Sequence, residues 1–158
     1  MTESFLIIRL SSLGDIIHTL PAFSALRKNF PEAKISWVVE EKGNEILEFV
    51  PGIDRVIAAQ IKGWRINKKK FWTEISRLKR EIKNKDQVAL DFQGLAKSGF
   101  LAFLSGAKKR IGFHRKNLRE PLATLFYTDR LEAIPETEHV INKNLRLLTK
   151  LGIHEKKY

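Results

Sequence analysis

Short apolar segments with the length of β-strands alternate along this chain with longer segments of helical periodicity. Helices between strands favour crossover connections, so the alternation predicts a mostly parallel sheet with helices on both faces. The fold class that we expect is α/β. The predicted strands are Phe5–Leu10, Ile35–Val39, Arg55–Ala59, Val88–Phe92 and Arg110–Phe113.

The helical segments differ in how clearly the sequence marks them. Phe71–Asn84 has one apolar stripe and is the clearest amphipathic helix. Leu95–Leu104 is apolar on most sides, which predicts a buried helix. The remaining predicted helices are Ile16–Asn29, Gly43–Val50 and Glu138–Leu151. Pro21 lies inside the first of these and predicts a kink or a late start.

Length and composition are those of one ordinary globular domain over residues 1–158, with 43% hydrophobic and 30% charged residues. The chain has no cysteine, which excludes disulfides and thiolate metal sites. No apolar run approaches the length of a transmembrane helix. Glu3 precedes the first apolar run and Arg9 ends it, which is unlike a signal peptide, so we expect the cytoplasm.

The formal net charge of +11 predicts an attraction to anionic partners. The cations gather in two segments, Lys62–Lys70 and Lys108–Arg119, and we expect both to lie on the same side of the domain as Asp15. Two interpretations stay open for them: a solvated surface that keeps the protein soluble, or a surface that binds nucleic acid, anionic lipid or a phosphorylated substrate.

The turn after the first strand carries a single acid, Asp15. In open α/β sheets chemistry gathers at the carboxyl edge of the strands, where this carboxylate is expected to project. The turn lacks the glycine patterns of phosphate-binding loops. Asp15 is therefore either a catalytic base or a residue that favours the helix dipole, with Ser11 or Ser12 capping the helix.

Several ordered blocks of the chain resemble glycosyltransferase family 9, the lipopolysaccharide heptosyltransferases, and favour its heptosyltransferase I subfamily. The first is Arg9–Pro21, which is similar to the opening motif of that family. The other similar blocks are Trp37–Glu41, Asp91–Ser98, Arg119–Ala123, Leu125–Tyr127 and His139–Val140.

The resemblance implies the N-terminal, acceptor-side half of a GT-B enzyme, a fold with two Rossmann-like domains. Such an enzyme transfers heptose from ADP-heptose to a Kdo sugar on lipid A with inversion. Asp15 matches the general base. The donor nucleotide binds mainly in the C-terminal domain, which we expect to be absent from residues 1–158, so the chain by itself is expected to be inactive. ADP-heptose is a substrate, and no cofactor and no metal ligand set is expected.

The substrate-binding residues expected from the matching blocks come from three parts of the chain. Ser11, Ser12 and Gly14 belong to the opening motif. Lys62 and Arg65, beside Trp64, resemble an arginine-rich segment that would bind the acceptor's carboxylates or phosphates; lysine lacks the bidentate fork of arginine. The alternative for this segment is a solvated loop.

Lys97 and Arg119 complete the candidate set. Arg119 is expected to bind an anion, and Lys97 either contacts substrate or is a plain helix-face lysine. The expected location is the cytoplasm, peripheral to the inner membrane, with contact to anionic lipid and no nucleic acid partner. The alternative functions are a non-catalytic basic α/β module that binds nucleic acid or another polyanion, and a small flavodoxin-like nucleotide-binding enzyme.

Overall fold

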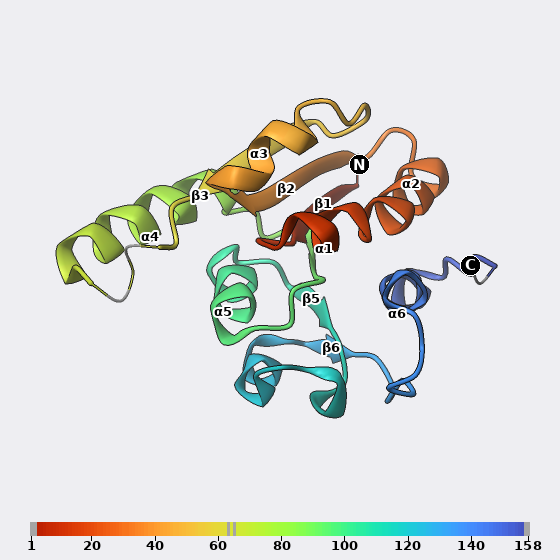
Figure 1. Cartoon of the computed structure of the whole chain (residues 1–158). Helices are drawn as coiled ribbons and strands as arrows, with labels where there is room; N and C mark the ends of the chain where they lie inside the picture. The colour runs from red at the N-terminus through yellow and green to blue at the C-terminus, as the bar shows by residue number, and fades with distance from the viewer. Residues whose placement is uncertain (1–2, 63, 65, 157–158) are drawn as a thin grey trace.

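A computed structural model describes residues 3–62, 64 and 66–156 and shows a six-stranded sheet with helices on both faces (Figure 1). The strands are β1 (Ser4–Ile8), β2 (Lys34–Glu40), β3 (Arg55–Ala59), β4 (Val88–Asp91), β5 (Lys109–Gly112) and β6 (Asp129–Arg130). Their order in the sheet is β3-β2-β1-β4-β5-β6, and every neighbouring pair is parallel. The predicted α/β class and parallel sheet are confirmed, and the order is that of Rossmann rather than flavodoxin-like folds.

Among the described residues, six α-helices and three short 3₁₀ helices lie between the strands or follow the last of them. They are α1 (Leu13–Ile17), α2 (Leu20–Asn29), α3 (Glu41–Leu47), α4 (Lys68–Ile82), α5 (Ala96–Leu104), α6 (Val140–Leu147), η1 (Arg115–Asn117), η2 (Pro121–Phe126) and η3 (Leu148–Leu151). Among the described residues, no helix combines the length and apolar character needed to cross a membrane.

The predicted helix Ile16–Asn29 is in fact two helices, α1 and α2, with the break at His18 and Thr19. Pro21 stands in the first turn of α2, where a missing N–H breaks no helical hydrogen bond. At the break, the Thr19 hydroxyl donates to the Asp15 carbonyl at 2.8 Å. The break therefore separates the short helix that carries Asp15 from the longer helix that packs on the sheet.

The two faces of the sheet have separate apolar cores. Along β1, Phe5 and Ile7 belong to the core shared with α2 and α6, whereas Leu6 and Ile8 belong to the core shared with α4 and α5. This alternation follows from the two-residue period of a strand. Both faces are covered, which explains why the strands read as continuous apolar runs.

The chain changes direction in the sheet between β1 and β4. From β1 it proceeds outward through β2 to β3, and then returns to place β4 on the other side of β1. At such a switch point the loops after the two central strands part and leave a crevice, where ligands bind in this class of fold. The turn that contains Asp15 follows β1 directly, as predicted for the carboxyl edge.

Candidate functional site

A buried arginine holds the turn after β1. Arg9 is only 7% exposed, and its Nη1 donates to the carbonyl oxygen of Phe92 at the end of β4. Its Nη2 lies 2.9 Å from Oδ1 of Asp15. Burial lowers the pKa of Arg9, and the charge of Asp15 opposes that effect. The arginine thus joins the ends of the two strands that flank the switch point.

Asp15 is held from both sides. Its Oδ2 accepts hydrogen bonds from the backbone N–H and the hydroxyl of Ser12, both at 3.1 Å. Partial burial by itself would raise the pKa of Asp15, but the Ser12 hydrogen bonds and the charge of Arg9 outweigh it and bring the pKa below its usual value. The carboxylate is therefore ionised at neutral pH, and 37% of its side chain stays accessible.

The geometry of a helix cap is also present at this turn. Ser12 is the N-cap residue of α1, and the Asp15 side chain satisfies its backbone N–H. Such an arrangement stabilises a helix start whether or not the carboxylate does chemistry. Capping and general-base roles therefore coexist in this geometry, and the catalytic role of Asp15 stays a prediction.

Gln93 fixes the backbone of the same turn from the neighbouring strand. Its Oε1 accepts the N–H groups of Leu10 and Ser11 at 3.0 and 3.2 Å. The N–H of Gln93 itself donates to Oδ1 of Asp91 at 2.9 Å, as does the N–H of Gly94 at 3.2 Å. The loop after β4 therefore determines where the loop after β1 lies.

Asp91 is completely buried beneath this loop. Its Oδ2 accepts hydrogen bonds from the hydroxyls of Tyr127, at 2.6 Å, and Ser98, at 2.9 Å. Burial raises the pKa of Asp91 although these donors favour the ionised form. Burial, together with the charge of Asp91, also raises the pKa of Tyr127.

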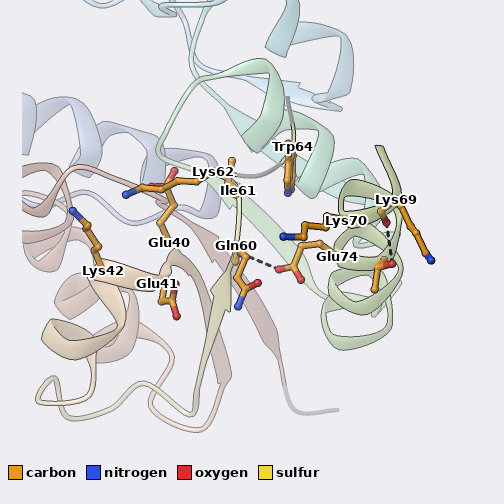
Figure 2. Close-up of a pocket in the computed structure, with 12 residues that line it drawn as sticks. Glu40, Glu41, Lys42, Gln60, Ile61, Lys62, Trp64, Lys69, Lys70 and Glu74 are labelled. Atoms are coloured by element: carbon orange, nitrogen blue, oxygen red, sulfur yellow. Dashed lines mark hydrogen bonds between the residues drawn. The ribbon is translucent and has the colours of Figure 1, made fainter. Parts of the chain in front are cut away.

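A cavity of about 650 Å³ lies beyond the carboxyl ends of β2 and β3 (Figure 2). It adjoins the turn after β1, because the N–H of Glu40 donates to the carbonyl of Leu10 at 2.9 Å. Lys70 and Glu74 both project from α4 on one side of it, and Glu74 accepts the N–H of Gln60 at 2.9 Å (Figure 2). The lining residues are Glu40, Glu41, Lys42, Ala59, Gln60, Ile61, Lys62, Trp64, Lys69, Lys70, Thr73 and Glu74.

The predicted substrate residues fall into two groups around this edge. Ser11, Ser12 and Gly14 surround Asp15, and a Cβ added to Gly14 would meet no atom within 4 Å. Lys62 lines the cavity, whereas Arg65 lies outside the described residues.

Lys97 and Arg119 approach the same edge from α5 and from the segment before η2. Lys97 Nζ is 3.2 Å from Oε1 of Glu40, so the lysine pairs with a residue of the cavity wall. Arg119 is exposed, and its charge contributes, after burial, to the lowered pKa of Arg9. Both residues are therefore near the two parts of the site, and their binding roles stay predictions.

The second basic segment lies only partly at the edge of the sheet that carries Asp15, contrary to expectation. The described part of Lys62–Lys70 follows β3 and lies at the carboxyl edge with Asp15. Lys108–Arg119 contains β5, so its first residues lie at the opposite edge, where Lys109 Nζ donates to the carbonyl of Lys150 at 3.0 Å. The prediction was wrong because it treated a strand and its flanks as one loop.

Sequence reasoning missed Arg9, Gln93, Asp91 and Tyr127 as parts of the site. Arg9 had a visible signal, since it directly follows an apolar strand and a cation there is costly unless it is paired. Gln93 stood inside a recognised block without an assigned role. Among the described residues, no group of three or more His, Asp or Glu side chains is arranged to hold a metal ion.

The strand order defines a doubly wound α/β domain, with the fixed carboxylate of Asp15 at the switch point and a cavity lined by lysines and glutamates beside it. The chain belongs to glycosyltransferase family 9: the family model described as "Glycosyltransferase family 9 (heptosyltransferase)" matches residues 75–157. That match includes Lys97 and Arg119.

Curated relatives extend the similarity to the first half of the chain. Lipopolysaccharide heptosyltransferase 1 of Pseudomonas aeruginosa is 36% identical over 148 residues, which are 90% of this chain and 41% of that protein. Its counterpart in Escherichia coli K12 is 34% identical over 92% of this chain and 46% of that protein. The chain thus spans less than half the length of these relatives.

The solved structure of E. coli heptosyltransferase WaaC with ADP-2-deoxy-2-fluoro heptose superposes on the chain with a TM-score of 0.87 and 30% identity. The match covers 98% of this chain and 50% of that one. A family 9 glycosyltransferase of Veillonella parvula has a TM-score of 0.80 at 24% identity and shares the fold.

Proposed function

We propose that this chain provides the acceptor side and the catalytic base of an inverting heptosyltransferase. The donor is ADP-heptose, and the acceptor is a Kdo sugar of the lipopolysaccharide inner core. The observation that carries the proposal is the ionised carboxylate of Asp15, fixed by Arg9 and Ser12 at the switch-point crevice. Membership of family 9, with relatives that are heptosyltransferases, supports it. The same membership favours a transferase over a module that binds nucleic acid.

In the proposed reaction, Asp15 accepts a proton from the acceptor hydroxyl. The hydroxyl oxygen attacks the anomeric carbon of heptose, the bond from that carbon to the diphosphate breaks, and ADP leaves from the opposite face. The lowered pKa makes Asp15 a weak base, so the proton moves late, when the attacking oxygen has become acidic. Arg9 is positioned to hold the Asp15 carboxylate in a fixed orientation during the transfer.

The cavity is the proposed acceptor site. Lys62 and Lys70 line it from opposite sides and are suited to carboxylates of Kdo or phosphates of lipid A, because both ammonium groups border one concave surface (Figure 2). Arg119 extends the positive charge toward Asp15. The donor nucleotide is proposed to bind mainly to the part of the enzyme that corresponds to the other half of the relatives. The proposed location is the cytoplasmic surface of the inner membrane.

The test is Asp15→Asn in a chimera that joins residues 1–158 to the remaining part of the E. coli relative. Asparagine keeps the shape and still caps a helix, but its amide cannot take the proton. We expect kcat to fall by about 10²–10⁴-fold with a smaller change in acceptor KM. The melting temperature should fall as well, because buried Arg9 loses its charged partner, but the variant should stay folded at the assay temperature. Asp86→Asn, at an exposed turn before β4, is the matched control. If kcat stays within a few-fold of the unchanged chimera, Asp15 is only a cap.

A further inference from the structure

We propose that the N-terminal end of α4 docks this protein on an anionic bilayer, with Trp72 and Ile66 entering the headgroup region. The inference rests on the proposed function in one respect: the acceptor is anchored in a membrane by its acyl chains. It goes further by naming the surface that meets the membrane and the side chains that enter it.

Two large apolar side chains are exposed at this end of the helix. Ile66 is 88% exposed and Trp72 is 64% exposed. The Trp72 ring packs edge-on against Phe71, with centroids 5.1 Å apart, and Phe71 packs in the same way against Trp64 at 5.3 Å. The indole is therefore supported from behind while its outer surface faces solvent. A tryptophan presented in this way is suited to the boundary between water and hydrocarbon.

The turn that leads into α4 is itself well defined. Oδ1 of Asn67 accepts the N–H groups of Lys69 and Lys70 at 3.0 and 3.2 Å and so caps the helix. Ile66 precedes this cap directly, and Trp72 lies in the second turn of the helix. The cap thus keeps both apolar side chains at the same end of one rigid element.

Charge on α4 is strongly one-sided. Every exposed charged residue of the helix is a cation: Lys68, Lys69, Lys70, Lys79 and Arg80. Its two acids, Glu74 and Glu81, are half-buried, and both pair with Arg77, at 2.6 and 2.5 Å. The outer surface of α4 therefore offers uncompensated positive charge beside exposed apolar groups, a combination that is typical of segments that lie on anionic membranes.

The position of α4 suits this role. Figure 1 shows the helix on the outer side of the molecule next to β3, with no other element beyond it. Lys69 and Lys70, in its first turn, also line the cavity. A lipid-anchored acceptor in a bilayer that contacts this end of α4 would therefore have its head group close to the cavity mouth.

A second exposed apolar surface is the alternative candidate for contact with the membrane. Leu122 and Leu125 of η2 are 66% and 76% exposed. No residue of η2 itself is charged, but the exposed cations Arg115, Lys116 and Arg119 precede it closely in the chain, so this surface is a real competitor for anionic lipid. The two surfaces can be distinguished by substitution, because each depends on its own apolar side chains.

The test is co-sedimentation of the 158-residue chain with vesicles of phosphatidylcholine, with and without phosphatidylglycerol. We expect binding only to the anionic vesicles and a loss of binding as salt rises. Trp72→Ser should lower the partition coefficient about tenfold, the effect of exposing roughly 60 Å² of apolar surface. Lys68→Gln, at the N-terminal end of the helix, should lower it about fivefold, and Lys79→Gln with Arg80→Gln, in the last turn, should have less effect per charge removed. Phe49→Ser, at a still more exposed aromatic after α3, and Leu125→Ser should leave it unchanged.

Three results would overturn the proposal. The first is equal binding to neutral vesicles, and the second is loss of binding in Leu125→Ser but not in Trp72→Ser. The third is competition between single-stranded DNA and the vesicles for the chain, combined with no effect of Trp72→Ser on vesicle binding. Failure of the proposed function is separately visible. Asp15→Asn should bind vesicles normally, and Trp72→Ser in the chimera should transfer heptose normally to a water-soluble acceptor that lacks acyl chains.

Discussion

Removing one hydroxyl from the buried network below the site should measurably destabilise the fold. Tyr127→Phe keeps the ring and deletes only the donor that lies 2.6 Å from Oδ2 of Asp91. Asp91 is completely buried, so water cannot replace the lost partner, and three donors remain. A hydrogen bond to a charged group contributes about 1.5–3 kcal/mol, which predicts a loss of about 2 kcal/mol in the free energy of unfolding.

Urea denaturation and thermal melting of the 158-residue chain measure this loss. For a domain of this size, about 2 kcal/mol corresponds to a fall of about 4–8 °C in Tm. The effect should shrink in acid, because protonation of Asp91 removes the charge that strengthens the bond. Tyr127→Phe should also raise the pKa of Asp91 further, since it deletes a donor that favours the ionised form.

A double-mutant cycle tests the cause of that loss. Asp91→Asn removes the charge but keeps the shape, so Tyr127→Phe should cost at least about 1 kcal/mol less in that background. An equal cost in both backgrounds would refute the reasoning and assign the loss to altered packing of the ring. A loss below about 0.5 kcal/mol in the otherwise unchanged chain would refute it as well.

Three further substitutions test other parts of the site. Gly14→Ala should raise stability by about 0.5–1 kcal/mol, since the added Cβ meets no atom within 4 Å. If substrate occupies that space, the same change should lower kcat/KM of the chimera about tenfold, and unchanged transfer would contradict a substrate role. Glu74→Gln should lower stability at pH 7 by about 1 kcal/mol, because hydrogen bonds from Arg77 lower the pKa of Glu74. The difference between the two proteins should vanish as the pH falls through that pKa, and urea denaturation at several pH values measures it. Gly112→Ala should cost about 3 kcal/mol in thermal melts, because its Cβ would collide with the Tyr127 ring; near-native stability would show that the ring moves aside.

The sequence predicted the parallel sheet well because its signal is local. The central strands are buried on both faces and read as apolar runs, as in Ser4–Ile8. The two-residue strand Asp129–Arg130 escaped prediction, since it is too short to have a pattern and contains two charged residues. The break between α1 and α2 was also inexact: Pro21 marked the position, but the helix restarts one residue before it.

The site was harder to predict because its supports are distant in the sequence. Asp15 was found from its place after β1, where local pattern and motif agree. Gln93 and Arg9 act through contacts that span 83 residues, to Leu10 and Phe92 respectively, and no local periodicity reveals such contacts. The ion pair of Lys97 with Glu40 was missed for the same reason. Asp91 is a completely buried carboxyl group, and only the folded structure makes that burial visible.

The switch in strand order delays the completion of the sheet during synthesis of the chain. β1 is made first and pairs early with β2, but its other edge is completed only by β4. At a synthesis rate of about 5–20 residues per second, roughly 4–17 s separate Leu10 from Gln93 on the ribosome. During that interval the apolar edge of β1 has no partner, and the loop that carries Asp15 lacks its anchor. Ribosome-bound chains that end before β4 should therefore be the ones that chaperones hold.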